Sequence, residues 1–157
     1  MVELLRMNVP HVAPEAYRHL LELEEAIASK IDRKLLHLIK LRASQINGCA
    51  YCIAMHTQEA LSDGDAAERL LLLDAWHESP AFSAKERAAL EWVEEITLIS
   101  DGHAHKEAFD ALKPHFSEEE IVWLTLASSL INMWNRISIA SRAQFAAHAS
   151  EKVAEPA

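Results

Sequence analysis

The chain has 157 residues, of which half are hydrophobic and a quarter are charged, and its formal net charge is −9. This length predicts one domain with a core that needs neither disulfide bridges nor a structural metal, and the hydrophobic content excludes an intrinsically disordered chain. The acidic balance argues against a nucleic-acid partner, and no apolar run reaches the roughly 20 residues that cross a bilayer. Because residues 1–10 lack the pattern of a secretory signal, we expect a cytoplasmic protein that makes no membrane contact.

The elements predicted along the chain are all helical. Residues 1–14 are expected to be an irregular lead-in, because two prolines interrupt them. After that, apolar residues recur at a helical period, with helix-capping residues at several starts and breaking residues at several ends. The predicted helical segments are 15–30, 32–46, 49–61, 65–76, 88–100, 105–113 and 121–147.

The fold class follows from these segments. Only 3 glycines and 5 prolines are present, which is little turn material for a many-stranded β fold. No stretch alternates apolar and polar residues as a half-buried strand does. We therefore predict an all-α, single-domain bundle of about seven or eight helices over residues 15–147, followed by a frayed tail at 148–157.

The most informative stretch holds both cysteines of the chain, Cys49 and Cys52. If a helix begins after the break at Asn47-Gly48, Cys49 lies in its first turn, where free backbone N–H groups and the helix dipole favour an anion. Residues three and four apart share a helix face, so Cys49, Cys52 and His56 form one stripe. A helix N-terminus, a nearby imidazole and the basic residues before the break would all increase the thiolate fraction.

This pattern allows three interpretations. The first is a redox dithiol, in which one cysteine reacts and the other traps the oxidised sulfur as a disulfide. The second is a zinc site of Cys49, Cys52, His56 and, as a fourth ligand, His37, since structural zinc sites have four ligands. The third is a pair of buried cysteines with no chemical role. The histidine on the stripe and the helix break favour the redox dithiol.

Residues 35–60 closely resemble the alkyl hydroperoxidase D-like, carboxymuconolactone decarboxylase superfamily. The redox branch of that superfamily has a Cys-x-x-Cys-x-x-x-His signature after a segment similar to Leu41-Arg42-Ala43-Ser44-Gln45-Ile46-Asn47-Gly48. The run Ile131-Asn132-Met133-Trp134-Asn135-Arg136 also looks like the C-terminal helix of the family. The resemblance extends in outline over residues 15–145.

The resemblance implies an all-helical redox domain that forms homo-oligomers (dimer, trimer or hexamer) and reduces small-molecule hydroperoxides without flavin, metal or any other cofactor. It implies that the Cys52 thiol attacks the peroxide, with His56 as its base, and that Cys49 resolves the product into a disulfide. A dithiol protein or small-molecule reductant would then regenerate the enzyme. The catalytic residues expected on this basis are Cys52, Cys49, His56 and His37.

The sequence departs from the family pattern at two positions. His37 stands where the best-known members have a glutamate that relays protons, and Tyr51 stands where they have a histidine. An imidazole titrates in a range that suits a relay, so we expect His37 to serve the site. The alternative is that His37 is simply exposed, because it groups on a helical wheel with Arg33, Lys40 and Ser44, opposite the apolar stripe.

Two other functional classes remain open. One is a thiol-disulfide redox sensor or a disulfide reductase without fast peroxide turnover, and the other is a lactone decarboxylase of the sister branch, which needs no cysteine pair. An oligomer interface is expected on the last helix. The residues predicted to line it are Trp123, Leu126, Leu130, Trp134 and Ile137.

Overall fold

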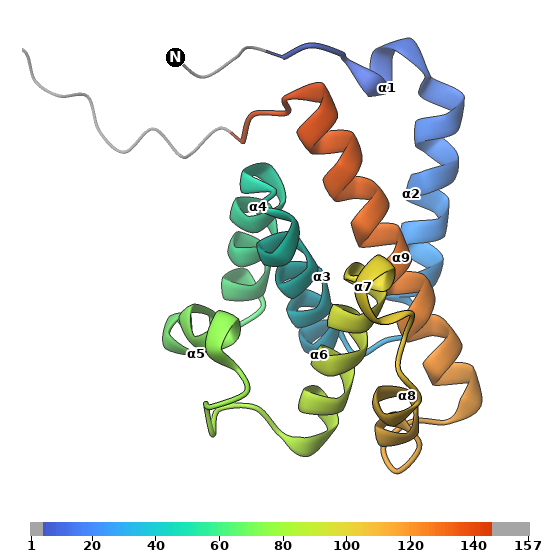
Figure 1. Ribbon diagram of the computed structural model, residues 1–157. Helices are drawn as coiled ribbons and strands as arrows, with labels where there is room; N and C mark the ends of the chain where they lie inside the picture. The colour runs from blue at the N-terminus through green and yellow to red at the C-terminus, as the bar shows by residue number, and fades with distance from the viewer. Residues whose placement is uncertain (1–4, 146–157) are drawn as a thin grey trace, which may run out of the picture.

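Figure 1 shows the computed structural model, which describes residues 5–145. The described residues form nine α-helices and one 3-10 turn and contain no strand, which confirms the all-α prediction. No helix in this part of the chain is both long and apolar enough to cross a membrane. The longer helices are α2 (Pro14–Ala28), α3 (Arg33–Asn47), α4 (Ala50–Ser62), α6 (Ala84–Thr97) and α9 (Glu118–Ser141). The short elements are α1 (Val9–Val12), α5 (Ala67–Leu71), η1 (Leu72–Ala75), α7 (Ile99–Gly102) and α8 (Lys106–Leu112).

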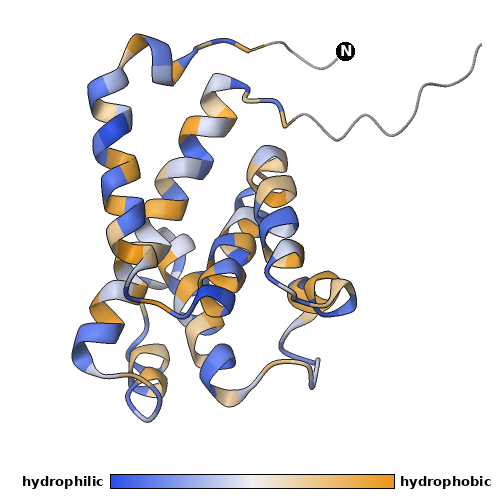
Figure 2. Ribbon diagram, turned by 180° about the vertical axis from the view of Figure 1, so that it is seen from behind, coloured by the Kyte–Doolittle hydropathy of each residue, from blue (hydrophilic) through white to orange (hydrophobic). Residues whose placement is uncertain are grey.

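Helix α3 is the centre of the bundle, because it packs against α4, α6 and α9. Its apolar side chains Leu38 and Leu41 are 0% and 1% exposed. They join one continuous core with buried side chains of α6 and α9, among them Leu90 and Ile131. Figure 2 shows hydrophobic and hydrophilic residues alternating in short stretches along the helices, as in amphipathic helices of a bundle. Helix α2 packs against α9 and contributes Ile27 to this core, and α1 packs against α2.

Local capping explains where the helices start. Asp32 caps α3 by accepting a hydrogen bond from the Leu35 N–H at 3.0 Å, as predicted. Reciprocal capping boxes open α6 at Ser83 and α9 at Ser117, where the serine hydroxyl and the glutamate three residues later each accept a backbone N–H. Helix α5 begins later than predicted, at Ala67. Asp65 does not cap it through a helical N–H, and instead accepts hydrogen bonds from the Ala66 N–H and the Arg69 guanidinium.

The two ends of the predicted domain need correction. The lead-in contains the single-turn helix α1, because Asn8 caps it and Pro10 fits its first turn. Helix α9 ends at Ser141 and not at 147, because Arg142 adopts a left-handed conformation with φ 57°. Residues 143–145 follow without helix. The predicted tail at 148–157 lies outside the described residues.

Candidate active site at the start of helix α4

The site is built by the sharp turn between α3 and α4. Gly48 ends α3 with φ 66°, a left-handed conformation that glycine adopts without steric cost. The Cys49 N–H then donates to the Ser44 carbonyl at 3.0 Å. Cys49 is the N-cap of α4, one position before the predicted first turn, and its sulfur accepts the Cys52 N–H at 3.3 Å. The helix start therefore directs backbone dipoles at the Cys49 sulfur.

Cys49 and Cys52 form a disulfide, with their Cα atoms 5.3 Å apart. Each residue is only 1% exposed. The two sulfurs nevertheless have different surroundings, because Cys52 lines a cavity whose wall does not include Cys49. Small molecules in the cavity would thus meet Cys52 first.

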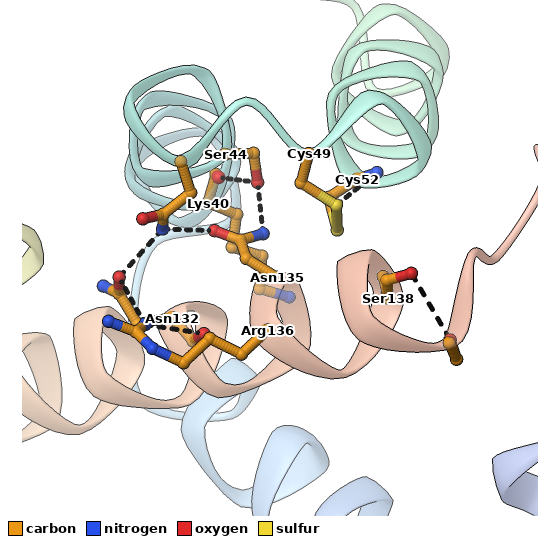
Figure 3. Close-up of a disulfide and its surroundings, with 10 residues drawn as sticks. Lys40, Ser44, Cys49, Cys52, Asn132, Asn135, Arg136 and Ser138 are labelled. Atoms are coloured by element: carbon orange, nitrogen blue, oxygen red, sulfur yellow. Dashed lines mark hydrogen bonds between the residues drawn. A yellow bond between two sulfur atoms is a disulfide. The ribbon is translucent and has the colours of Figure 1, made fainter. Parts of the chain in front are cut away.

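Beside the disulfide, between α3 and α9, lies an asparagine cluster that contains Ser44, Asn132 and Asn135 (Figure 3) and also Asn47. The Asn47 side-chain N–H₂ donates to the Oδ1 atoms of Asn132 and Asn135 at 2.9 and 2.8 Å. Asn135 in turn donates to the Ser44 hydroxyl at 2.9 Å, and Asn132 donates to the Thr97 hydroxyl at 2.9 Å. Because Asn135 and Ser44 are completely buried, this cluster fixes the α3–α4 turn to α9 from inside the core.

In front of the disulfide lies an open cavity of about 400 Å³. Its walls come from α2, α3, α4, α9 and the segment 5–10, which a hydrogen bond from the Arg6 N–H to the Ser141 carbonyl ties to the end of α9. The lining is mainly apolar. The apolar and aromatic lining residues are Leu5, Met7, Val9, Pro10, Tyr17, Leu21, Tyr51, Met55, Trp134, Ile137 and Ala143.

His56 lines the same cavity one helical turn after Cys52 and is 4% exposed. Its Nδ1 lies 2.9 Å from Oε2 of Glu59. The hydrogen bond from His56, assisted by the charges of His56, Lys40 and His37, holds the pKa of Glu59 below its ordinary value. An ionised Glu59 accepts the Nδ1–H of His56, which leaves Nε2 of the neutral ring free to accept a proton.

A second pair of charges lies in the cavity wall. The Lys40 ammonium of α3 forms an ion pair with Oε1 of Glu24 of α2, and the two side chains are 13% and 23% exposed. The indole N–H of Trp134 donates to the other Glu24 oxygen at 3.0 Å. Trp134 also packs edge-on against Tyr17, with ring centroids 5.4 Å apart. One lysine, Lys40, therefore lines the same cavity as Cys52 and His56.

The structure brings Cys49, Cys52 and His56 together and places His37 elsewhere. His37 is not part of the cavity wall. Its Nε2 lies 2.5 Å from Oδ2 of Asp63, which also binds Arg33 at 2.7 Å. The interpretation that His37 is solvent-exposed is wrong, because the residue is only 7% exposed, with Asp63 beyond the end of α4 as its partner.

Sequence reasoning did not find Glu59, Glu24 or the asparagine cluster. Glu59 could have been found, because it lies three residues after His56 and so shares its helix face. Asn132 and Asn135 could also have been found as two amides at helical spacing inside an apolar run. Glu24 gave no signal, because it meets Lys40 only through the packing of α2 on the bundle. Among the described residues, no group of three or more His, Cys, Asp or Glu is arranged to hold a metal ion.

Most of the α9 residues that were predicted to form an oligomer interface make contacts within the chain instead. Leu130 is 4% exposed and belongs to the core, so its assignment to an interface is wrong. Trp134 packs in the cavity wall as described above. Trp123 donates to Glu119 at 3.3 Å and lies under the Lys30 ammonium. The exposed apolar side chains of α9 are Val122, Leu126, Met133 and Ile139.

Comparisons with known proteins agree with this geometry. Residues 14–95 match the carboxymuconolactone decarboxylase family. The uncharacterized protein YdfG of Bacillus subtilis (strain 168) is 42% identical over 136 residues, which are 86% of this chain and 92% of YdfG. The uncharacterized protein YnjA of Escherichia coli (strain K12) is 26% identical over 112 residues, 71% of this chain and 61% of YnjA.

Solved structures extend the similarity to the whole described fold. ATU0492 of Agrobacterium tumefaciens, a protein of unknown function with a suggested role as the antioxidant defence protein AhpD, is 42% identical. It superposes with a TM-score of 0.89 over 92% of this chain and 99% of that one. The apo debrominase Bmp8 has a TM-score of 0.74 over 85% of this chain and 73% of its own. At 24% identity, this second likeness shows the fold alone.

Proposed function

Because the chain belongs to the carboxymuconolactone decarboxylase family, we propose that it is a thiol-dependent peroxidase of the alkyl hydroperoxide reductase type. One observation carries this proposal: a Cys49–Cys52 disulfide whose second sulfur shares a cavity wall with a buried histidine. A disulfide of this kind is the oxidised state that a two-cysteine peroxidase reaches after each turnover. Reducing conditions in the cytoplasm would supply the dithiol donor that restores both thiols.

The proposed cycle starts from the reduced protein. Nε2 of His56 accepts the proton of the Cys52 thiol, and the thiolate attacks the terminal oxygen of a hydroperoxide, ROOH. The O–O bond breaks, Cys52 becomes a sulfenic acid, and the leaving alkoxide takes the proton from His56 and departs as ROH. The Cys49 thiol then loses its proton and attacks the Cys52 sulfur, which forms the disulfide, and the displaced hydroxide takes that proton and leaves as water. An external dithiol reduces this disulfide by two electrons and becomes a disulfide itself.

The two cysteines have the environments that these roles require. Cys52 faces the cavity and the imidazole, so it can receive a peroxide. Cys49 is shielded from the cavity, and its sulfur accepts the Cys52 N–H at the helix start. That hydrogen bond stabilises a Cys49 thiolate, which favours Cys49 both as the resolving nucleophile and as the leaving group when the disulfide is reduced.

Reduced protein mixed with one equivalent of an organic hydroperoxide tests the proposal, with tryptophan fluorescence and intact mass as readouts. We expect fast loss of two hydrogens in the wild type, no reaction in Cys52→Ser and an accumulated sulfenic acid in Cys49→Ser. Oxidation no faster than that of a free thiol would instead favour the sensor or disulfide-reductase alternative. A sulfenic acid that accumulates on Cys49 in Cys52→Ser would reverse the assigned roles.

His37 remains a proposed contributor to proton transfer, although it lies outside the cavity wall. Support comes from its neighbourhood, since its charge helps to hold the pKa of Glu59 low and Glu59 holds His56. We expect His37→Ala to slow peroxide-driven oxidation a few-fold. An unchanged rate, in a variant with native helicity, would remove His37 from the mechanism.

We also propose that the chain assembles into a homo-oligomer. The exposed apolar residues of α9 support this, because side chains such as Val122, 53% exposed, and Met133, 46% exposed, gain from burial against a second copy. Light scattering should give a multiple of the 17.6 kDa chain mass. A mass equal to one chain would contradict the assembly.

A further inference from the structure

A largely buried ion pair joins α3 to α2 in the cavity wall. The Lys40 and Glu24 side chains are 13% and 23% exposed, and both residues line the cavity that Cys52 also lines. A buried ion pair rarely adds much stability, because removing two charges from water costs about as much as their attraction returns. Active sites are places where fixed charges are arranged around reactive groups. The location of this pair, beside a redox-active sulfur, therefore points to chemistry.

We propose that the Lys40 ammonium stabilises the Cys52 thiolate and that Glu24 limits this stabilisation by partly neutralising Lys40. This inference rests on the proposed function, because it takes Cys52 as the reactive thiol. In the reduced protein, a positive charge in the cavity wall favours the thiolate over the thiol. The cavity is largely apolar, so water screens this attraction less than it would at the surface.

None of the other ionisable groups in the described cavity lining carries a permanent positive charge. Helix α2 contributes Tyr17 and Glu24, and α4 contributes Tyr51, His56 and Glu59. The lining residues of α9 carry no charge, and those of segment 5–10 carry none either. In the proposed cycle His56 is the proton acceptor, so it contributes a positive charge to this step only after the Cys52 proton has moved to it. Lys40 is therefore the one permanent cation in the described lining.

Two independent contacts support the direction of the effect. Lys40 lies near enough to the active face of α4 to help hold the pKa of Glu59 low. Glu24 is held on the α9 side by the Trp134 indole at 3.0 Å. Glu24 thus holds the Lys40 ammonium within the wall of the cavity that Cys52 and Glu59 also line. Glu24 is a positioning residue, since it acts on Cys52 only through Lys40.

The test uses four forms of the full chain: wild type, Lys40→Met, Glu24→Gln and the double variant. Each is fully reduced, and the pH dependence of Cys52 alkylation by iodoacetamide is read by peptide mass spectrometry, which separates Cys52 from Cys49. Lys40→Met should raise the pKa of the Cys52 thiol by about one unit, and Glu24→Gln should lower it by a similar amount. The wild type and the double variant should lie between these two.

The double variant keeps the experiment interpretable, because it removes both charges and leaves neither buried alone. If all four forms titrate alike while their unfolding midpoints differ, the pair is structural and the inference is wrong. Alkylation consumes no peroxide, so the outcome is separate from the proposed function. If Lys40→Met and Glu24→Gln shift the pKa of Cys52 in opposite directions but the protein does not turn over peroxide, the inference is supported and the proposed peroxidase function is contradicted. Fast peroxide turnover without these pKa shifts would support the peroxidase function and contradict the inference.

Discussion

The two sides of the Cys49–Cys52 disulfide differ in how their polar groups are satisfied. On the inner side, the asparagine cluster is hydrogen-bonded within the chain, and Asn135 and Ser44 are completely buried. On the outer side, His56 and Lys40 face an open cavity of about 400 Å³, and their partners Glu59 and Glu24 lie in its wall. The inner side has the features of a structural support, and the outer side has those of an active-site cavity. Substitutions on the outer side should therefore lower the reaction rate, and substitutions on the inner side should lower the stability of the fold.

The largest effect is expected on the outer side, for His56→Ala. Loss of a general base commonly costs a factor of 100 or more in rate, so we expect oxidation of Cys52 by hydroperoxide to slow about 100-fold. Stopped-flow fluorescence measures this rate. The matched control is His105→Ala, because His105 also has its Nδ1 2.9 Å from a glutamate but is exposed and far along the chain. A control that slows as much as His56→Ala would show that the effect is not specific to the site.

An intermediate effect is expected on the inner side, for Asn135→Ala. The substitution removes the acceptor of one Asn47 bond and the donor to Ser44, and it leaves a small void in the core. Unsatisfied buried polar groups cost about 1–3 kcal/mol, so the free energy of unfolding should fall by about 2 kcal/mol. Urea unfolding measures this change, with Ser129→Ala on the exposed face of α9 as the control.

The Asn135→Ala variant also tests whether the two sides of the disulfide have separate roles. If Asn135→Ala retains its stability but loses peroxide-driven oxidation as strongly as His56→Ala, the inner side takes part in the reaction. If it loses stability and oxidises at the wild-type rate under native conditions, the division into structural support and active-site cavity holds.

The sequence predicted features that depend on neighbouring residues better than those that depend on contacts between distant segments, and it missed the asparagine cluster of the inner side as well as much of the outer cavity. The helix break, the caps at Asp32, Ser83 and Ser117, and the stripe of Cys52 and His56 all depend on residues close together in the chain, and local hydrogen bonds decide them. The end of α9 was placed too late, because apolar residues continue past Ser141 while the backbone reverses at Arg142. Periodicity alone does not register such a reversal.

The outer cavity depends on contacts between distant segments, which periodicity does not report. Glu24 and Lys40 meet across two helices, and residues 5–10 reach the cavity only because Arg6 binds the end of α9. His37 shows the same limit. Its position in the sequence suggested that it either lines the site or is exposed to solvent. In the structure it does neither, because it pairs with Asp63, 26 residues further along the chain.

The smallest expected effect tests whether the outer side of the disulfide also contributes to the stability of the fold. The hydrogen bond from His56 lowers the pKa of Glu59 in the folded state below its value of 4.5 in the unfolded chain. A lowered carboxyl pKa adds stability that is fully present above pH 4.5 and disappears as the pH falls through the folded-state pKa. Glu59→Gln should abolish this dependence, so the wild type should be the more stable form at pH 7 and lose that advantage in acid.

The Glu59 side chain is 47% exposed, so water screens the interaction and the advantage at pH 7 should stay below about 1 kcal/mol. Urea unfolding of both forms between pH 3 and 7 measures it. A gap of several kcal/mol at neutral pH would mean that the pair of His56 and Glu59 supports the fold as strongly as the asparagine cluster does. In that event the loss of rate in His56→Ala could come from a displaced α4 as well as from a missing base. A small gap that closes in acid leaves the missing base as the cause, and it confines the structural role to the inner side of the disulfide.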